Sequence, residues 1–367
     1  MGSYQIAEQS ASRETTPQVV VITGGSSGIG RCTAALFARR GWHVGLIARG
    51  AEGLAACSQD IEAAGSVAAT AQADVTDTAA LLSATNAIIA ELGPIDVWIN
   101  CAGNGVYGRF DDVPEAEFQR VTDVTYHGTV NGTRVALSHM RPRGYGSIVN
   151  VCSAIAFHGL PLLSSYAGAK AAVRAFGQAM RSELALDRCP VRISTVFPPA
   201  VNTPFFSHAT SHMGWPARPA RPVYQPEVVA QGIWQAAMSG RPEMTITGTA
   251  ATFVLMTRVA PTLIGWCVSQ LSSARQMTRD EPICQLQEPT LFTPSQRVFG
   301  VHGPFGKWAR RWSIQLLLER LFVFAVTSTF EWTRRVKSPP DARSPATHVP
   351  PELCPELWDS AGRPGEP

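Results

Sequence analysis

The chain has 367 residues, 45% of them hydrophobic and 16% charged, which suits one large α/β domain with additions, or two domains. The formal net charge is only +3, and arginine and lysine are scattered, which excludes a nucleic-acid-binding surface. The eight cysteines form no CxxC pair and have no metal-ligand spacing, so we expect free thiols in a reducing compartment, by default the cytoplasm.

Short apolar runs alternate with helix-like segments after a polar tail, residues 1–17, which we expect to be disordered. The predicted strands are 19–23, 43–48, 67–73, 95–99, 146–152, 191–197 and 244–247. The predicted helices are 29–40, 51–64, 77–92, 115–140, 164–186 and 226–239. Strands such as VVVIT are apolar at successive positions, which is typical of a parallel sheet buried on both faces. We therefore predict an α/β fold, a Rossmann-type doubly wound sheet over residues 18–248.

The last third of the chain departs from this alternation. Residues 249–274 and 306–330 are apolar and helix-like, with an irregular stretch between them, and they predict a helical extension over 249–336. Residues 337–367 are rich in proline, which indicates a disordered tail. The apolar run 321–330 is too short to span a bilayer, so packing on the main domain is favoured over membrane contact.

A glycine-rich turn, TGGSSGIG at 23–30, stands between the first strand and the first helix. Glycines permit positive φ and close approach of a pyrophosphate, and the helix N-terminus offers unpaired N–H groups. This position predicts a dinucleotide-binding turn. Its predicted cofactor contacts are Thr23, Gly24, Ser26, Ser27, Gly28, Ile29 and Gly30.

The end of the second strand predicts the type of cofactor. Enzymes that prefer NAD usually carry an acid there, which binds the ribose 2′-hydroxyl. This chain has Ala48 followed by Arg49, whose guanidinium can pair with a 2′-phosphate. We therefore predict NADP(H), with Arg49 as a contact; in the alternative, Arg49 is a solvated residue at a helix start.

Ser153, Tyr166 and Lys170 follow the spacing S-x12-Y-x3-K. Tyr166 and Lys170 are four residues apart, so they share one face of the predicted helix. The ordinary pKa of a phenol is about 10, too high for a good base at neutral pH, and a neighbouring ammonium is expected to lower it. The three side chains are the predicted catalytic set, with Tyr166 as acid and base.

These motifs, with Asn-Cys-Ala-Gly at 100–103 in place of NNAG, resemble those of the classical short-chain dehydrogenase/reductase family over residues 18–248. The resemblance implies an oxidoreductase that transfers a hydride between nicotinamide and a carbonyl or alcohol substrate, and Arg49 makes NADP(H) the predicted cofactor. It implies that Ser153 binds the substrate oxygen, that Lys170 and Tyr166 also contact the cofactor, and that the protein is a homo-oligomer. The further cofactor contacts that it implies are Asp74, Val75, Asn100, Ala102, Gly103, Val201 and Thr203.

The chain departs from the family pattern at two positions. Thr125 stands where the family often has an asparagine that holds a water joining the lysine to solvent, and Asn131 lies too far round the helix to replace it. Pro199 replaces the usual glycine of the PGxVxT segment. These departures leave open a catalytically weak or inactive nucleotide-sensing or scaffold protein.

Residues 204–225 form a long Pro-rich segment where we expect a substrate lid and a bulky, apolar substrate. The side chains expected to line the pocket are Phe157, Leu162, Phe205, Phe206, Met213, Trp215 and Tyr224. His208 and His212 are four residues apart but lie among Pro and Ser, and we expect no metal site. A membrane-docked lipid or steroid reductase is a further alternative, because of the apolar run 321–330.

Overall fold

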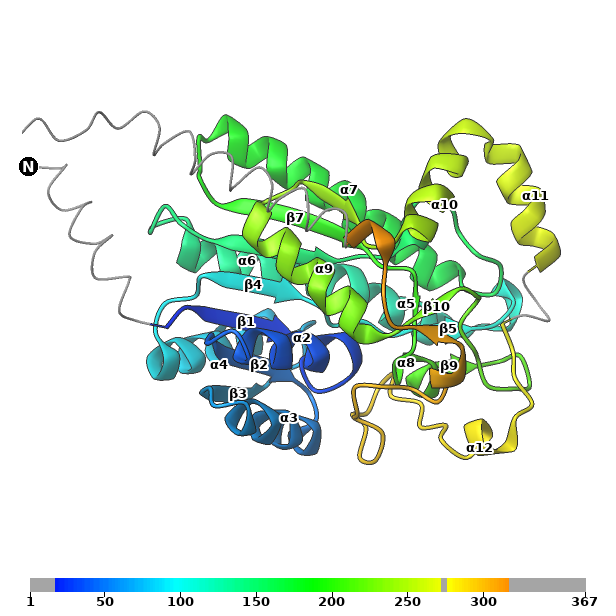
Figure 1. The fold of residues 1–367 in the computed structure, drawn as a ribbon, viewed down its shortest axis with the longest axis horizontal. Helices are drawn as coiled ribbons and strands as arrows, with labels where there is room; N and C mark the ends of the chain where they lie inside the picture. The colour runs from blue at the N-terminus through cyan, green and yellow to red at the C-terminus, as the bar shows by residue number, and fades with distance from the viewer. Residues whose placement is uncertain (1–16, 272–275, 317–367) are drawn as a thin grey trace, which may run out of the picture. The chain divides into compact units, whose positions relative to one another are not determined.

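Seven parallel strands form the central sheet, in the order β11-β7-β6-β4-β1-β2-β3 (Figure 1). Their bounds are β1 Val19–Thr23, β2 His43–Ala48, β3 Ala68–Gln72, β4 Val97–Asn100, β6 Ser147–Val151, β7 Arg192–Phe197 and β11 Glu243–Thr245. On β1, Val21 pairs with Gly45 on β2 and with Trp98 on β4. The strand order reverses beside β1, and ligands of doubly wound sheets bind at such a switch point. The computed structural model describes residues 17–271 and 276–316, and all of these fall in one compact unit.

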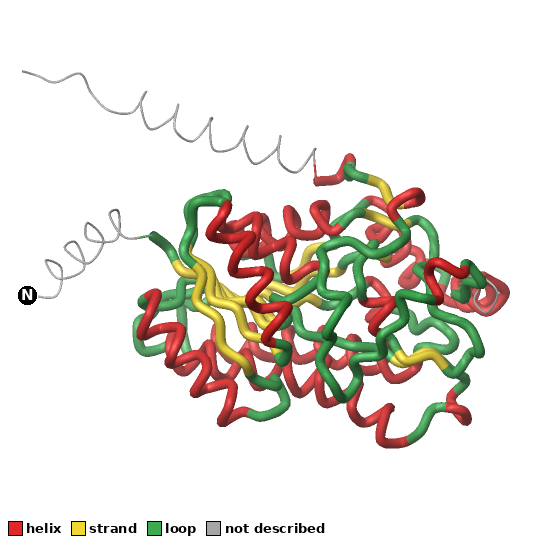
Figure 2. The backbone as a smooth tube through the Cα atoms, turned by 90° about the horizontal axis from the view of Figure 1, so that it is seen from below, coloured by secondary structure: helices red, strands yellow, loops and turns green. Residues whose placement is uncertain are grey.

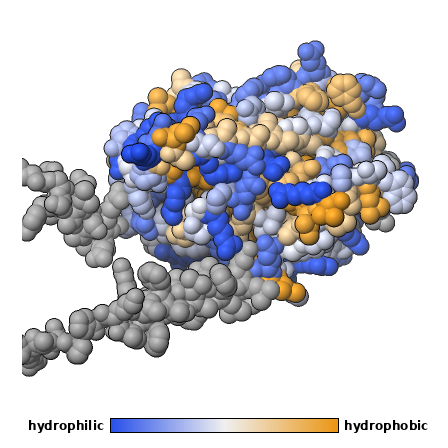
Figure 3. Space-filling model, turned by 90° about the horizontal axis from the view of Figure 1, so that it is seen from above, coloured by the Kyte–Doolittle hydropathy of each residue, from blue (hydrophilic) through white to orange (hydrophobic). Residues whose placement is uncertain are grey.

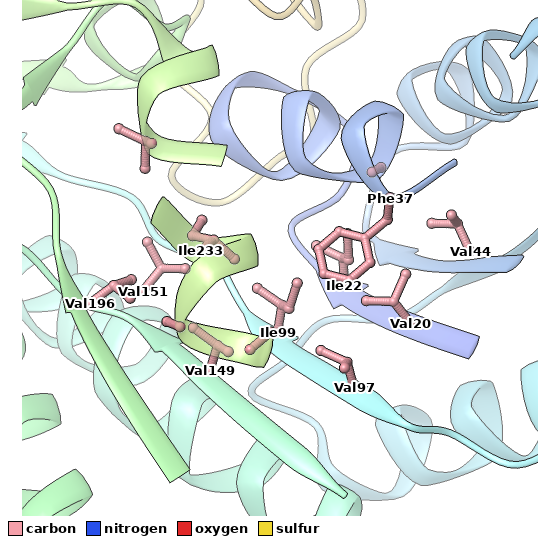
Figure 4. Packing of buried hydrophobic residues seen from close by; sticks show 14 of the residues in the cluster. Val20, Ile22, Phe37, Val44, Val97, Ile99, Val149, Val151, Val196 and Ile233 are labelled. Atoms are coloured by element: carbon pink, nitrogen blue, oxygen red, sulfur yellow. The ribbon is translucent and has the colours of Figure 1, made fainter. Parts of the chain in front are cut away.

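Helices cover both faces of the sheet. The first face carries α2 Gly28–Ala38, α3 Ala51–Ala63 and α9 Pro226–Ser239, and the second carries α4 Thr78–Leu92, α6 Gly128–Met140 and α7 Ser164–Leu186. Figure 4 shows Phe37 of α2 and Ile233 of α9 over the strand residues Val20, Ile22 and Ile99. Complete burial of such a side chain contributes roughly 1.5–3 kcal/mol, so this layer holds α2 and α9 firmly on the sheet. The predicted doubly wound fold is confirmed.

The predicted helix 115–140 contains a break at its centre. It consists of α5 Glu115–Thr122, a π-helical turn at Asp123–His127, and α6. Gly128 follows the turn, and a Cβ on it would lie 2.5 Å from a methyl group of Val75. The backbone therefore approaches the loop after β3 very closely here. Such π turns are frequent at functional sites, and this one contains Thr125.

The extension is helical at its start, where α10 Gly248–Val259 and α11 Pro261–Leu271 form a helical pair, followed by the short α12 Glu281–Cys284. The prediction of helix for 306–310 is wrong, because these residues form a 3-10 turn and then β12 Ala309–Arg310. β12 pairs with β10 Val223–Tyr224, whose other edge pairs with β8 Ala200–Val201. Residues 309–310 therefore form the edge strand of a small sheet, because the free edge of β10 is open to backbone pairing.

Several predictions fall outside the described residues: the tails 1–16 and 337–367 and the apolar run 321–330. Among the helices of the described residues, none has the length and apolar character needed to cross a membrane. The loops that follow the strands gather at the end of the sheet where the carboxyl ends of the strands lie (Figure 2).

Candidate active site

The carboxyl ends of the strands open into a cleft of about 990 Å³. One half of it is lined by the glycine-rich turn, by Arg49 after β2 and by Asp74 after β3. The other half is lined by Ser153 and Tyr166 together with apolar loop residues. The predicted site residues that line this cleft are Gly24, Ser26, Ser27, Gly28, Ile29, Gly30, Arg49, Asp74, Val75, Ala102, Gly103, Ser153, Tyr166, Lys170, Val201 and Thr203.

The glycine-rich turn is packed backbone against backbone. Gly24 has φ +68°, and a Cβ on it would lie 2.7 Å from Cα of Ala102. A Cβ on Gly30 would collide with the carbonyl oxygen of Gly24. Side chains at these positions would push the turn away from β4, so the glycines fix both its shape and its distance from the strands.

Thr23 and Asn100, which were predicted to contact a cofactor, lie behind the cleft rather than on its wall. The Thr23 hydroxyl accepts the N–H of Cys101 at 3.2 Å. Asn100 is buried, accepts the indole N–H of Trp98 at 2.7 Å and donates to Asn150 at 2.8 Å. Both side chains hold β4 and the turn after it in place, so their contribution to the cleft is indirect.

Two arginines and one carboxylate meet at the end of β3. Arg120 of α5 forms a short ion pair with Asp74, and Arg49 lies 4.0 Å from the same carboxylate. Burial and the neighbouring Arg120 lower the pKa of Arg49. Burial opposes ionisation of Asp74, but hydrogen bonds from Arg120 and Thr76 outweigh it and lower its pKa. The cluster therefore carries a net positive charge. The sequence analysis did not identify Arg120 as a site residue.

The Arg49 guanidinium is held by the extension. It donates to the carbonyl oxygens of Thr290 at 2.6 Å, Phe292 at 3.2 Å and Leu291 at 3.3 Å. Arg120 donates to the carbonyl of Leu291 at 3.2 Å. Arg49 therefore lines the cleft, as a cofactor contact would, and it is not the freely solvated side chain of the alternative interpretation.

The three predicted catalytic residues come together on the cleft wall. Ser153 follows β6, and its hydroxyl accepts the N–H of Ile155 at 3.4 Å. Tyr166 and Lys170 lie on the first turns of α7, with the Lys170 Nζ 5.5 Å from the centre of the Tyr166 ring. Lys170 donates to the carbonyl of Val151 at 2.7 Å, which fixes its ammonium group between β6 and α7.

The ionisation of this set differs from the sequence-based expectation. Burial raises the pKa of Tyr166 and lowers the pKa of Lys170. The ammonium is directed at the Val151 carbonyl, and the loss of hydration outweighs its attraction for a phenolate. The phenol is therefore protonated at neutral pH, which is the form that donates a proton.

The buried hydroxyl of Thr125 lies near Lys170 and has no hydrogen-bond partner among the described residues. The Oγ1 of Thr125 and the Nζ of Lys170 each lie 3.8 Å from the position that a Cβ on Gly103 would occupy. Thr125 is buried, and within the described part of the chain its hydroxyl and both amide atoms of Asn104 are buried without a hydrogen-bond partner. Asn131 instead donates to the carbonyl of Val75 at 3.0 Å, so it does not take the place of Thr125.

The predicted lid lines the cleft with Phe205, Phe206, His208 and residues 218–222, and two of these are aromatic side chains predicted from the sequence. Phe205 and Phe206 of α8 Phe205–His208 line it, and the ring centroids of Phe205 and Tyr166 are 5.4 Å apart. The expectation is wrong for Phe157, Leu162, Met213, Trp215 and Tyr224, which lie elsewhere. Tyr224 is buried as part of β10, for example. The apolar lining comes instead from Leu160, Leu163, Phe253, Ile264, Cys267 and Val268.

The two histidines of the lid have separate partners. His208 is bonded to the carbonyl of Val298, and burial lowers its pKa. His212 contacts the carboxylate of Glu117 at 2.8 Å. The described residues contain no group of His, Cys, Asp and Glu side chains that could hold a metal ion.

Comparison with known proteins agrees with this geometry. The family model for the short chain dehydrogenase matches residues 18–214, and the chain belongs to that family. The uncharacterized oxidoreductase YxnA of Bacillus subtilis is 33% identical over 248 residues, which cover 67% of this chain and 70% of that protein. The 3-ketodihydrosphingosine reductase of Bos taurus is 30% identical over 229 residues, 60% of this chain and 68% of that protein.

A solved structure has a similar fold. The crystal structure of an actinorhodin polyketide ketoreductase variant with NADPH aligns with a TM-score of 0.56 and 25% sequence identity. The alignment covers 62% of this chain and 95% of the ketoreductase. The ketoreductase therefore corresponds to the main domain, and a large part of this chain lies beyond it.

Proposed function

We propose that this protein is an NADPH-dependent reductase of a ketone with a large apolar body. One observation carries the proposal: Tyr166 lines the same cleft as Ser153 and the glycine-rich turn. Burial raises the pKa of its phenol, which favours the protonated form. A proton donor beside a dinucleotide cradle is the arrangement that reduction of a carbonyl group requires.

The residues of the cleft fit a nicotinamide dinucleotide. Gly24, Gly28 and Gly30 line the cleft at the N-terminus of α2, where N–H groups and the helix dipole favour the pyrophosphate of a dinucleotide. Asp74 and Val75 would contact the adenine, Lys170 the nicotinamide ribose, and Val201 with Thr203 the carboxamide. When bound, the dinucleotide supplies the hydride for the reduction.

The charge at the end of β3 favours NADPH over NADH. Arg49 and Arg120 face a single carboxylate, Asp74, so the cluster has one positive charge left for a 2′-phosphate. A guanidinium pairs well with phosphate oxygens, and both arginines are partly buried, where such a charge interaction is stronger than in water. The ketoreductase structure with a similar fold contains NADPH, which agrees with this assignment.

The chemistry of the substrate half follows from its lining. Phe205, Leu163 and residues of α10 and α11 offer apolar contacts, and Ser153 and Tyr166 are polar groups of the same wall. Arg218, Arg221 and Gln276 also line the cleft. Ser153 would hydrogen-bond the ketone oxygen, and Tyr166 would donate the proton to it. Two similar proteins carry the names 3-ketodihydrosphingosine reductase and polyketide ketoreductase, and these names support a ketone as the substrate here.

A direct assay tests the proposal. Long-chain β-keto and aromatic ketones are mixed with the protein and NADPH, and NADPH loss is followed at about 340 nm. We expect turnover of apolar ketones, a rate that stays level across neutral pH, and a fall at high pH as the phenol loses its proton. Ser153→Ala removes the hydroxyl that would bind the ketone oxygen, so this variant should lose most of the rate. NADPH binding without turnover of any ketone would favour the nucleotide-sensing alternative.

A second candidate is a lipid reductase that takes its ketone from a membrane surface. Leu255, Val259, Leu263 and Trp266 of the α10–α11 pair are half or more exposed, and the same helices line the cleft. Figure 3 shows apolar side chains among polar ones at the end of the molecule where α10 and α11 lie. Sedimentation with anionic lipid vesicles tests this: Leu263→Ser with Trp266→Ser should lower the bound fraction, and an unchanged fraction would remove the candidate.

A further inference from the structure

A segment of the extension, residues 288–300, lies against the nucleotide half of the cleft; we call it the strap. In Figure 1 it is the gold segment next to the blue α2 and α3. A Cβ on Gly53 of α3 would lie 3.3 Å from Cβ of Phe299, and one on Gly50 would lie 3.2 Å from Pro294. The glycines at the start of α3 therefore let the strap approach closely. The strap residues that line the cleft are Thr290, Pro294, Ser295 and Phe299.

Three groups of the nucleotide half bind the strap through its backbone. The N–H of Gly28, in the glycine-rich turn, donates to the carbonyl of Gly300 at 3.0 Å. Arg31 of α2 donates to the carbonyl of Phe299 at 2.9 Å. Arg49 donates to the three carbonyls at 290–292 described above. The strap thus reaches from the end of β2 to the first turn of α2.

The strap also has an internal scaffold. The carboxylate of Glu288 accepts the hydroxyl of Ser295 at 2.6 Å and the N–H groups of Gln296 at 2.8 Å and Val298 at 3.0 Å. Burial alone would raise the pKa of Glu288, but these hydrogen bonds outweigh it and lower the pKa to about 2. Glu288 therefore folds the strap on itself before any ligand arrives, which reduces the conformational entropy lost on binding.

Both ends of the strap are attached to the lid and to the segment after β7. The N–H of Thr290 donates to the carbonyl of His208 at 3.0 Å. Beyond the strap, Gly303 and Phe305 donate to the carbonyl and the side chain of Asn202 at 3.2 Å and 2.9 Å. The strap is thus a loop closed at both ends across the cleft.

We propose that the strap is a cofactor clamp that encloses the adenosine half of NADPH and slows its release. The proposal rests on the proposed function, because NADPH is the ligand. A nucleotide between the glycine-rich turn and Pro294 leaves when the contacts of the strap to Gly28, Arg31 and Arg49 break. The clamp lies outside residues 18–214, which match the family model, so it is an addition of this chain to the nucleotide site.

Hydrogen exchange of the native protein gives the first test. We expect NADPH and adenosine 2′,5′-bisphosphate, which carries only the adenosine end, to slow exchange across 290–299 by at least about tenfold. Nicotinamide mononucleotide should leave these amides unchanged. NADPH binding without protection of 290–299 would overturn the clamp and leave the proposed reductase intact. Absence of any nicotinamide nucleotide binding would overturn both.

A substitution at Glu288 gives the second test. Glu288→Gln keeps the shape of the side chain but removes the negative charge to which the hydroxyl and N–H groups of the strap donate. NADPH should therefore dissociate about tenfold faster in stopped-flow fluorescence. The KM for NADPH should rise while kcat at saturation does not fall. Glu281→Gln, an exposed carboxylate on α12 of the same extension, is the matched control and should change neither value. Equal dissociation rates in all three proteins would overturn the clamp.

Discussion

The two halves of the cleft are built in different ways. The nucleotide half is made largely of backbone: Gly24 and Gly30 pack against neighbouring main-chain atoms, and the strap contributes carbonyl oxygens. The substrate half is made of side chains from distant segments, such as Phe205 of α8 and Ile264 of α11. A backbone-built site tolerates few residue types, whereas a wall of apolar side chains can be repacked. Substitutions should therefore act on the two halves separately.

The largest expected effect is at the boundary between the halves. Tyr166→Phe removes the phenolic proton donor, so kcat for ketone reduction should fall by about 10²- to 10⁴-fold. NADPH affinity, measured by fluorescence titration, should stay within about twofold, because the ring remains. Tyr126→Phe, on the π-helical turn, is the control and should keep its rate. Retention of more than a few per cent of kcat in Tyr166→Phe would place the proton donor elsewhere.

The next effect concerns only the nucleotide half. Arg49→Asp brings a second carboxylate next to Asp74, so NADPH should bind at least about tenfold more weakly relative to NADH, or about 1.4 kcal/mol. The ratio of the two dissociation constants is the quantity to measure, because a loosened strap weakens both cofactors alike. The KM for the ketone at saturating cofactor should not change. If the native protein bound NADPH and NADH equally, the role given to Arg49 would be wrong.

The same difference between the halves explains what the sequence could predict. The TGGSSGIG turn, the strands and the Ser153, Tyr166 and Lys170 spacing were predictable, because local backbone geometry demands particular residues at fixed intervals. The strap, Arg120 and the lining from α10 and α11 were not, since contacts between segments far apart in the chain leave no local pattern. Arg49 and Phe292 are 243 residues apart, and Arg120 and Leu291 are 171 residues apart. For the same reason, five of the seven aromatic and apolar side chains expected in the pocket lie elsewhere.

A smaller effect is expected in the substrate half. Phe205→Ala removes part of the apolar wall beside Tyr166, so the KM of a long-chain ketone should rise by about fivefold, a fraction of the value of burying a whole phenyl group. Cofactor affinity should not change. Phe292→Ala, an exposed phenyl group on the strap, is the control for loss of an aromatic side chain. A change in NADPH affinity as large as the change in KM would show that the two halves are not independent.

The smallest effect concerns Thr125, whose hydroxyl is buried beside Lys170 without a partner among the described residues. A buried hydroxyl without a hydrogen bond is costly, and a water between Thr125 and Lys170 would give this hydroxyl a partner. Such a water would return a proton to Tyr166 after each turnover. Asparagine reaches farther than threonine, so it should hold the water more firmly.

Thr125→Asn should therefore raise kcat by about two- to threefold at high pH, where resupply of the proton limits the rate. Thr125→Val keeps the shape, removes the hydroxyl and should lower kcat there by a similar factor. The solvent deuterium isotope effect on kcat should be largest in the valine variant and smallest in the asparagine variant. One common pH profile for the three proteins would reduce Thr125 to a packing residue of the π-helical turn. The unpartnered hydroxyl beside Lys170 would then have no part in the reaction.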